Sequence, residues 1–249
     1  MKSRFSQQSD LYARYRPDYP PELYDFITDH VDKRSVAWDC ATGTGIVAAT
    51  LANYVDKVLA TDISREQMQH APDKANITYT CVPAEDTGFP DHIFDLITVG
   101  QAIHWFDFKR FYEEVRRVAR DGAVIAVFGY GMIQVDNRLN QKLHAFYDEM
   151  FGRYFNENRR YLDEKYQTIP FPFDEISTPR FRRRLEWSLE ELEGFLNSWS
   201  PVQQYKNDTG SNPVNPLLTE IMTLWDPGET KTVTFPIFLR LGRISANQA

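Results

Sequence analysis

The amino-acid sequence predicts an α/β fold with a mostly parallel sheet and helices on both of its faces. Short, almost wholly apolar runs alternate with helix-like segments over residues 35–131, and strands that are apolar throughout belong to parallel sheets covered on both faces. Residues 36–45 have the pattern of a buried strand that ends in an acidic residue and a small-residue loop. A helix is predicted directly after this loop, and a glycine loop at a helix N-terminus brings backbone N–H groups against a ligand.

The alternation predicts each element of this sheet in turn. Pro20 and Pro21 open a helix that reaches about Val31, because proline suits the first helical turn. Ser64 and Gln67 fit a capping box at the start of another helix. The strands are predicted at residues 35–40, 57–63, 77–83, 94–101 and 123–129, and the helices between them at residues 46–54, from residue 64 onward, and at residues 107–119.

The pattern changes after Gly131. A helix near residues 137–151 leads into a polar and aromatic stretch at residues 152–161, which is expected to cap a substrate pocket. The remaining elements are predicted as a strand at 180–187, helices at 189–198 and about 215–225, and a closing strand at 232–242. We expect a single domain with an N-terminal arm and first helix (1–34), a binding core (35–131), a cap insertion (132–179) and a C-terminal completion of the sheet (180–249).

Composition argues against several kinds of partner. A net charge of −7 disfavours nucleic acid and anionic membranes as main partners, because both require a basic face. No apolar run approaches membrane-spanning length, and the first residues lack the apolar segment of a signal peptide, so a cytoplasmic protein is expected. Cys40 and Cys81 lie in predicted inner strands, so we expect buried free thiols and no metal site. The arginines of residues 180–184 are expected on the solvent face of a strand.

Acidic residues occur at the ends of three successive predicted strands. Asp39 precedes the glycine loop, Asp62 lies near the end of the second strand, and Glu85 follows the third. Because open α/β sheets bind ligands at the carboxyl edge of their strands, these acids are expected to surround one ligand.

Two ligands fit this loop. The spacing Gly43-x-Gly45-x-x-Ala48 matches the fingerprint of dinucleotide sites. A carboxylate at the mouth of the loop is awkward beside a pyrophosphate, however, and favourable beside the ammonium and sulfonium groups of S-adenosylmethionine (SAM). The acids therefore favour SAM over a dinucleotide.

Four segments occur in a fixed order: Asp39-Cys-Ala-Thr-Gly43-Thr-Gly45, Asp62-Ile63-Ser64, Ala84-Glu85-Asp86 and Phe94-Asp95-Leu96-Ile97. Together they resemble the motifs of class I SAM-dependent methyltransferases over about residues 10–131, although Ala41 stands where that family commonly has glycine. The segments Tyr15-Arg-Pro-Asp-Tyr-Pro20, Gln101-Ala-Ile-His-Trp-Phe106, Trp187-Ser-Leu-Glu-Glu191 and Ser198-Trp-Ser200 resemble the type 11 subgroup that includes trans-aconitate-type methyltransferases. The resemblance implies a Rossmann-like seven-stranded sheet with an antiparallel last strand.

The resemblance also implies roles for individual residues. The loop and Asp39 would face the methionine part of SAM, Asp62 the ribose, Ile63 the adenine ring, and Gln101 the sulfonium side. An N-terminal arm that carries Arg16 would close over the cofactor. The implied cofactor-binding residues are Tyr15, Arg16, Asp39, Ala41, Thr42, Gly43, Gly45, Asp62, Ile63, Ala84, Glu85, Gln101 and Ala102.

The acceptor side is expected to be lined by Tyr12, Tyr19, His104, Trp105 and Tyr130. His104 is either a general base or a structural histidine beside Trp105, and a carboxylate acceptor needs no base. We expect methyl transfer from SAM, which leaves S-adenosylhomocysteine, to a small molecule, with a trans-aconitate-like carboxylate as the first candidate. The alternatives are methylation of another O, N or C centre, a nicotinamide-dependent oxidoreductase, and a non-catalytic SAM-binding protein.

Overall fold

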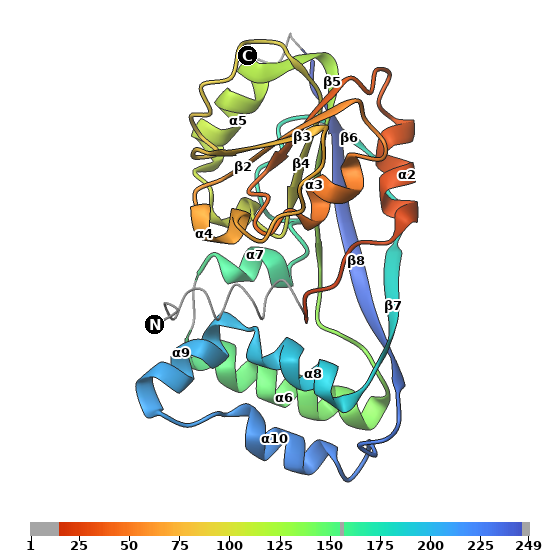
Figure 1. The fold of residues 1–249 in the computed structure, drawn as a ribbon, viewed down its shortest axis with the longest axis vertical. Helices are drawn as coiled ribbons and strands as arrows, with labels where there is room; N and C mark the ends of the chain where they lie inside the picture. Colours follow the sequence, from red (N-terminus) through yellow and green to blue (C-terminus); the bar gives the residue numbers. More distant parts are fainter. Residues whose placement is uncertain (1–14, 155–156, 246–249) are drawn as a thin grey trace. The chain divides into compact units, whose positions relative to one another are not determined.

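The computed structural model describes residues 15–154 and 157–245 of the 249-residue chain. The chain divides into two compact units, both of which appear in Figure 1. The sheet unit comprises Asp18–Tyr130, Arg160–Phe181 and Ile237–Ala249, and the helical unit comprises Met1–Pro17, Gly131–Arg159 and Arg182–Pro236. Each unit is therefore assembled from segments that are distant in the sequence.

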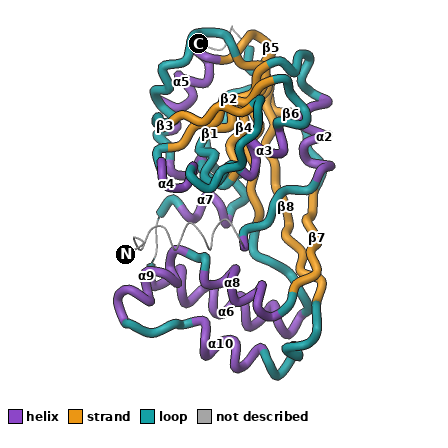
Figure 2. Tube along the Cα trace, viewed as in Figure 1, coloured by secondary structure: helices purple, strands orange, loops and turns teal. Residues whose placement is uncertain are grey.

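The predicted mostly parallel sheet is confirmed. In the described part of the chain seven strands follow one another in the sheet, as the resemblance implied, and an eighth, β7, pairs with β8 outside this order; strands are drawn in orange in Figure 2. Five of them are parallel neighbours in the order β3-β2-β1-β4-β5. β8 pairs antiparallel with β5, as the predicted last strand should, and both β6 and β7 pair with β8. The strands are β1 (Val36–Cys40), β2 (Lys57–Asp62), β3 (Ile77–Cys81), β4 (Phe94–Gly100), β5 (Ala119–Tyr130), β6 (Asp174–Ile176), β7 (Phe181–Trp187) and β8 (Lys231–Arg243).

The core of the sheet unit forms around Trp38 of β1. Its ring centroid lies 5.8 Å from that of Phe94 and 6.1 Å from that of Phe111. Phe111 belongs to the buried stripe of α5 (Phe108–Val118), whose helical spacing predicted this face. Each such side chain contributes about 1.5–3 kcal/mol through burial, so the apolar runs that predicted the strands also stabilise the sheet.

The helices of the sheet unit begin where the sequence signals them. α2 (Pro21–Asp29) has proline in its first turn. α4 (Arg65–Met68) begins after Ser64, whose hydroxyl accepts a hydrogen bond from the backbone N–H of Gln67 at 3.2 Å. The other helices of this unit are α3 (Ile46–Leu51), the 3₁₀ turn η1 (Ile103–Trp105) and α5. α7 (Arg159–Asp163) also belongs to the sheet unit except for its first residue, which is assigned to the helical unit.

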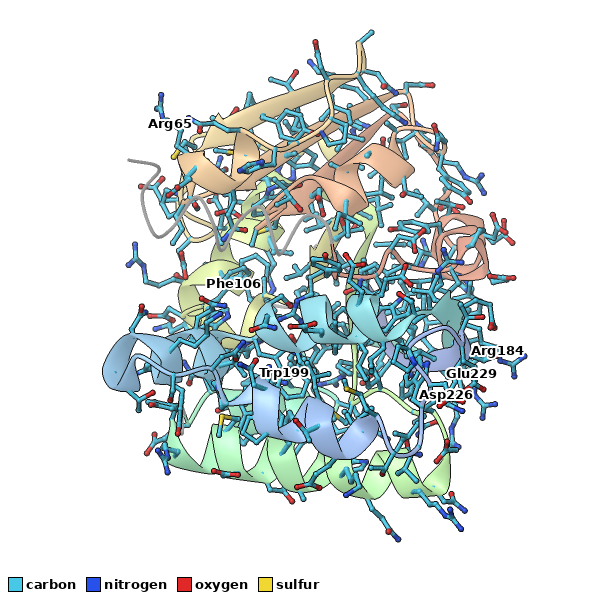
Figure 3. All side chains as sticks on the ribbon, turned by 60° about the horizontal axis from the view of Figure 1, so that its bottom comes forward. Arg65, Phe106, Arg184, Trp199, Asp226 and Glu229 are labelled. Atoms are coloured by element: carbon cyan, nitrogen blue, oxygen red, sulfur yellow. The ribbon has the colours of Figure 1, made fainter. Side chains whose placement is uncertain are left out.

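The helical unit is built on aromatic packing around Trp199. The ring of Trp199, labelled in Figure 3, contacts Phe195 at 5.8 Å and Phe146 at 6.1 Å between centroids. Ser188 and Glu191 form the predicted capping box. The helices are α6 (Asn137–Arg153), α8 (Leu189–Asn197), α9 (Ser200–Thr209) and α10 (Val214–Ile221).

Some of the sequence predictions are confirmed by the structure and others are wrong. Arg182 and Arg184 are exposed on β7, as predicted, and Arg184 extends outward in Figure 3. Cys40 is a buried free thiol, as predicted, but the prediction for Cys81 was wrong, since its thiol is exposed. The reason is that β3 is the edge strand of the sheet. α9 was not predicted, because its sequence is mostly polar. No described helix has the length and apolarity needed to span a bilayer.

Candidate active site

Three carboxylates lie along one edge of the sheet unit. Asp39 is near the end of β1, Asp62 is the last residue of β2, and Glu85 lies in the segment after β3. These strands are parallel neighbours, so their carboxyl ends meet at the same edge. The structure thus brings together the acids that the sequence placed at successive strand ends.

Asp39 is a buried charge held by hydroxyl groups. Its side chain is 1% exposed. Thr42 donates to Oδ2 at 2.5 Å and Thr98, its neighbour on β4, donates to Oδ1 at 2.8 Å. Burial raises the pKa of Asp39 to about 6, although both hydroxyl bonds oppose this, and the nearby charge of Asp62 adds to it. A cationic ligand at this edge would stabilise the ionised form.

Asp62 joins the glycine loop to the second strand. Its Oδ2 accepts from the backbone N–H of Gly43 at 2.8 Å, and its Oδ1 accepts from that of Ser64 at 2.7 Å. A carboxylate oxygen can accept a second hydrogen bond, so both oxygens can still receive ribose hydroxyl groups. The next residue, Ile63, is 78% exposed, which suits an apolar side chain that covers a ligand ring.

The loop after β1 has the backbone of a ligand cradle. Gly43 and Gly45 adopt left-handed conformations with φ of +57° and +77°. A Cβ on Gly45 would lie 2.8 Å from the Cβ of Ala71 and 2.9 Å from the hydroxyl oxygen of Tyr79, so only glycine fits. Ala41 also adopts φ +55°, which an L-residue does at a cost of roughly 1–2 kcal/mol. Alanine therefore keeps the turn that glycine commonly makes in the resembling family.

Thr44 is a residue of this loop that the sequence did not single out. Its side chain is buried, and its hydroxyl has no hydrogen-bond partner among the described residues. Because buried polar groups are normally paired, this hydroxyl is a candidate contact for a ligand. Only its place between the two glycines could have indicated it.

The end of β3 supplies the last acid of the edge. Ala84 is buried in the core cluster, and Glu85 accepts a hydrogen bond from the backbone N–H of Asp107 at 3.1 Å. Asp107 is the N-cap of α5. Glu85 is therefore fixed in place by the start of a helix, with its second oxygen left for a donor such as an amino group.

Two of the predicted residues follow β4. Gln101 has φ +57°, and its backbone N–H donates to the carbonyl of Phe128 at 2.9 Å. Ala102, which follows it, is buried. Since β4 lies between β1 and β5, this turn borders the glycine loop on one side and the end of β5 on the other.

The imidazole of His104 is hydrogen-bonded to a tyrosine hydroxyl. Its Nδ1 lies 2.9 Å from the hydroxyl oxygen of Tyr166, and both side chains are buried. The neighbouring Trp105 is 59% exposed, and its ring centroid is 4.8 Å from that of His104. An exposed indole beside a buried imidazole fits the wall of a small-molecule site.

Tyr166 and Arg240 are further residues that sequence reasoning missed. The guanidinium of Arg240 on β8 donates to the carbonyl oxygens of Tyr166 and Ile169, each at 3.0 Å, and forms an ion pair with Glu175. Arg240 thus fixes the segment that carries the partner of His104. No local pattern marks this contact, because the residues are far apart in the sequence.

The other predicted acceptor residues differ in their surroundings. Tyr19 and Tyr130 are both buried, and the ring of Tyr19 packs edge-on against Phe128 at 4.6 Å between centroids. Both side chains are part of the buried core of the sheet unit. Their contact with an acceptor stays a prediction. Tyr12 lies outside the described residues.

Tyr15 and Arg16 belong to the helical unit. The ring of Tyr15 lies so close to Gly194 that it would clash with a Cβ there. The guanidinium of Arg16 lies 5.3 Å from the ring centroid of Phe195 and donates to the carbonyl of Ser198 at 3.5 Å. Their predicted contact with a cofactor stays a prediction.

The assembled edge fits a cationic, adenosine-like ligand better than a pyrophosphate. Asp39, Asp62 and Glu85 all present carboxylates, and a diphosphate beside them would be repelled. No group of three or more His, Cys, Asp and Glu side chains suited to a metal ion occurs within residues 15–154 and 157–245. The three carboxylates accept hydrogen bonds and carry negative charge, so they suit ammonium, sulfonium and hydroxyl groups of a ligand.

Comparison with known proteins agrees with this chemistry. Residues 38–127 match a family described as a methyltransferase domain. A protein of Dictyostelium discoideum named as a methyltransferase is 30% identical over 249 residues, which cover 96% of this chain and 94% of the relative. A protein of Saccharomyces cerevisiae named as an S-adenosylmethionine-dependent methyltransferase is 24% identical over 83% of each chain. The solved structure of a type II methyltransferase from Anaeromyxobacter dehalogenans matches with a TM-score of 0.86 and 34% identity, over 93% of this chain and 99% of that one.

Proposed function

Because the chain belongs to the class I SAM-dependent methyltransferases, we propose that it methylates a carboxylate oxygen of a small organic acid. The observation that carries the cofactor part is the row of acids at the ends of β1, β2 and β3. The acceptor part is supported by the surroundings of His104.

The cofactor would be held by residues of the sheet unit. The loop of Gly43 and Gly45 would take the methionine part, Asp62 would accept from the ribose hydroxyls, and Glu85 would accept from the adenine amino group. Bound SAM supplies a methyl group on a positively charged sulfur, which is already activated for transfer. The residues therefore need only to orient the two reactants and keep water away.

The acceptor would meet His104 as a hydrogen-bond donor. The hydroxyl of Tyr166 can donate a hydrogen bond, and Nδ1 of His104 lies within reach at 2.9 Å. If Tyr166 donates to Nδ1, the ring proton of the neutral imidazole is on Nε2. An Nε2–H group suits an anionic carboxylate, whereas removal of a proton from a hydroxyl or amine would need a bare nitrogen.

A labelled-methyl assay tests this proposal. Purified protein is incubated with SAM that carries a labelled methyl group and with a panel of small mono-, di- and tricarboxylic acids. We expect label in a product that releases methanol on treatment with alkali, because methyl esters hydrolyse and N-, C- and ether-O-methyl groups do not. Label in an alkali-resistant product would overturn the carboxylate.

Binding measurements test the cofactor separately. Calorimetry with SAM, S-adenosylhomocysteine and NAD(H) should show binding of the first two ligands and none of the third. Tighter binding of NAD(H) would contradict the cofactor. Binding of SAM without transfer to any acceptor of a broad panel would favour a non-catalytic SAM-binding protein.

A further inference from the structure

The side chain of Gln101 ends in a buried acceptor with no donor. Its Oε1 is buried and has no hydrogen-bond partner among the described residues. Its Nε2 donates to the carbonyl of Tyr130 at 3.2 Å, which fixes the orientation of the amide, because a flipped amide would set two acceptor oxygens against each other. A buried acceptor without a donor costs roughly 1–3 kcal/mol.

The backbone of Gln101 is also in an unfavourable state. Its φ of +57° is left-handed, which a residue with a side chain rarely adopts. The hydrogen bond from its N–H to Phe128 at 2.9 Å holds it there. Two costs thus fall on one residue at the edge of the sheet, where strained residues are often functional.

The unpaired oxygen lies beside residues of β5 and β8. Most of the candidate cofactor residues follow β3, β2 and β1, and only Gln101 and Ala102 follow β4. The Oε1 atom of Gln101 lies beside Gly129 of β5, 3.2 Å from the position that a Cβ on Gly129 would take. The ring of Phe238 on β8 lies at the same place, 2.7 Å from that position. Phe238 in turn packs against Tyr166 at 5.2 Å between centroids.

This chain of contacts connects Gln101 with the proposed acceptor site. Tyr166 holds His104, so the amide of Gln101 and the imidazole are linked through two aromatic rings of the sheet unit. Gly129 and Phe238 offer a water no hydrogen bond through the groups that face Oε1, and a buried water needs two to four polar partners. Gln101 as a whole is only partly buried. When a ligand binds, a rotation about the soft terminal torsion of Gln101 brings the oxygen to the ligand and gives up the 3.2 Å hydrogen bond to Tyr130.

We propose that Gln101 selects acceptors that carry a hydrogen-bond donor, a hydroxyl or an N–H group, next to the carboxylate that is methylated. The inference rests on the proposed function. The carboxylate is bound by a donor on the enzyme, and the second group is bound by an acceptor on the enzyme. Gln101 is then a specificity-determining residue, and an acid without the second group leaves its oxygen unpaired.

Matched pairs of acids test the inference. The pairs differ by one hydroxyl next to the carboxylate: malate and succinate, lactate and propionate, mandelate and phenylacetate. For the pair that the enzyme accepts, we expect kcat/KM to favour the hydroxylated acid by about 10- to 100-fold, which is the effect of pairing one buried polar group. Equal kcat/KM values for both members of every accepted pair would overturn the inference.

Variants of Gln101 test whether its side chain causes the preference for hydroxylated acids. In Gln101→Met the preference should fall to within about threefold. Gln101→Glu keeps an acceptor oxygen and should keep the preference, even where repulsion lowers both rates. Gln141→Met, at an exposed position of α6, is the matched control and should behave as the wild type.

The outcomes separate this inference from the proposed function. An unchanged preference in Gln101→Met contradicts the role of Gln101 while methyl transfer stands. Loss of SAM affinity in Gln101→Met with the preference retained would assign the oxygen to the cofactor instead. Absence of transfer by the wild type to any acid would overturn the proposed function itself, and this inference with it. If Gln101→Met does not fold, the preference of the wild type and of Gln101→Glu still decides.

Discussion

Two amide side chains, one in each unit, differ in how completely they are bonded. In the helical unit Asn197 donates to the carbonyl of Glu193 at 2.9 Å, and its Oδ1 accepts from Lys206 at 3.3 Å and Asn212 at 3.0 Å. In the sheet unit Oε1 of Gln101 has no donor within the described residues. A structural amide satisfies both of its ends, since an unpaired buried end is costly. A buried amide end without a partner therefore points to a ligand group that the chain does not provide.

The same contrast applies to the units as a whole. Both units pack an arginine on an aromatic ring: Arg159 lies 4.4 Å from the ring centroid of Phe151 in the helical unit, and Arg240 lies 4.4 Å from that of Phe171 in the sheet unit. The sheet unit also holds a carboxylate, Asp39, whose burial is unfavourable to its charge. Perturbed groups of this kind concentrate at functional sites. Pairs of matched substitutions in the two units can therefore separate binding from packing.

Gly45 and Gly210 give the largest expected contrast. Both adopt left-handed conformations, with φ of +77° and +71°, but a Cβ would meet Ala71 and Tyr79 at Gly45 and nothing within 4 Å at Gly210. Gly210→Ala should lower the free energy of unfolding by about 1 kcal/mol through backbone strain. Gly45→Ala should cost about 1–3 kcal/mol more through overlap and should weaken SAM binding. Denaturant unfolding measures both, and equal losses would contradict the tight cradle.

Asp39 should make stability depend on pH in an unusual direction. Its pKa in the folded protein is raised to about 6 from 3.8. Between these values the folded state binds the proton that the unfolded state has released, so this group's contribution to stability rises as the pH falls from about 7 to about 4. The difference corresponds to about 3 kcal/mol. SAM affinity should decrease as the pH falls through about 6, because a protonated Asp39 no longer attracts a cation.

Urea unfolding and calorimetry of ligand-free protein between pH 4.5 and about 7.5 check this prediction. Asp39→Asn should remove the contribution of this carboxyl group to both pH dependences, while groups such as Glu175, whose pKa is lowered by Arg240, keep theirs. Parallel curves for the wild type and the variant would show that Asp39 does not titrate in this range.

Asp62 and Glu220 are two carboxylates, one in the sheet unit and one in the helical unit, with different expected roles. Asp62→Ala should raise the dissociation constant of SAM by about 10- to 100-fold, because charged hydrogen bonds to the ribose are lost, on a scale of about 1–3 kcal/mol. Glu220→Ala removes an exposed ion pair with Lys142 in the helical unit. It should leave SAM affinity unchanged and cost less than about 1 kcal/mol in unfolding. An unaltered dissociation constant in Asp62→Ala would refute the ribose contact.

Arg159 provides the smallest expected effect. Its guanidinium lies over Phe151 at 4.4 Å and its Nε donates to the hydroxyl of Tyr147 at 3.1 Å. Arg159→Gln should lower the free energy of unfolding by about 1 kcal/mol through the lost cation–π contact, with SAM affinity intact. Arg138→Gln, at an exposed position of α6, should change neither quantity. A marked loss of SAM affinity in Arg159→Gln would show that this cluster contributes to binding.

The sequence predicted those features that depend on local patterns. The parallel strands β1 to β5 were predictable because such strands are mostly apolar, and Asp39 and Asp62 because each lies at a strand end, whereas β6 was not predicted. Contacts between distant segments were not predictable. The hydroxyl of Tyr166 lies beside His104, and Arg240, on the last strand, donates to the backbone carbonyl of Tyr166. Likewise, Cys81 resembles a core residue in sequence, and only the strand order shows that it lies at an edge.

That edge position gives the protein a built-in attachment point for a reporter. Cys40 is fully buried, and burial raises the pKa of its thiol well above the usual value, so it resists alkylation. Cys81 is exposed, and its sulfur lies 3.5 Å from the carbonyl oxygen of Ile63. A maleimide dye should therefore attach to the wild-type chain at one place, beside the candidate adenine contact. Its fluorescence would follow ligand binding without any engineered cysteine.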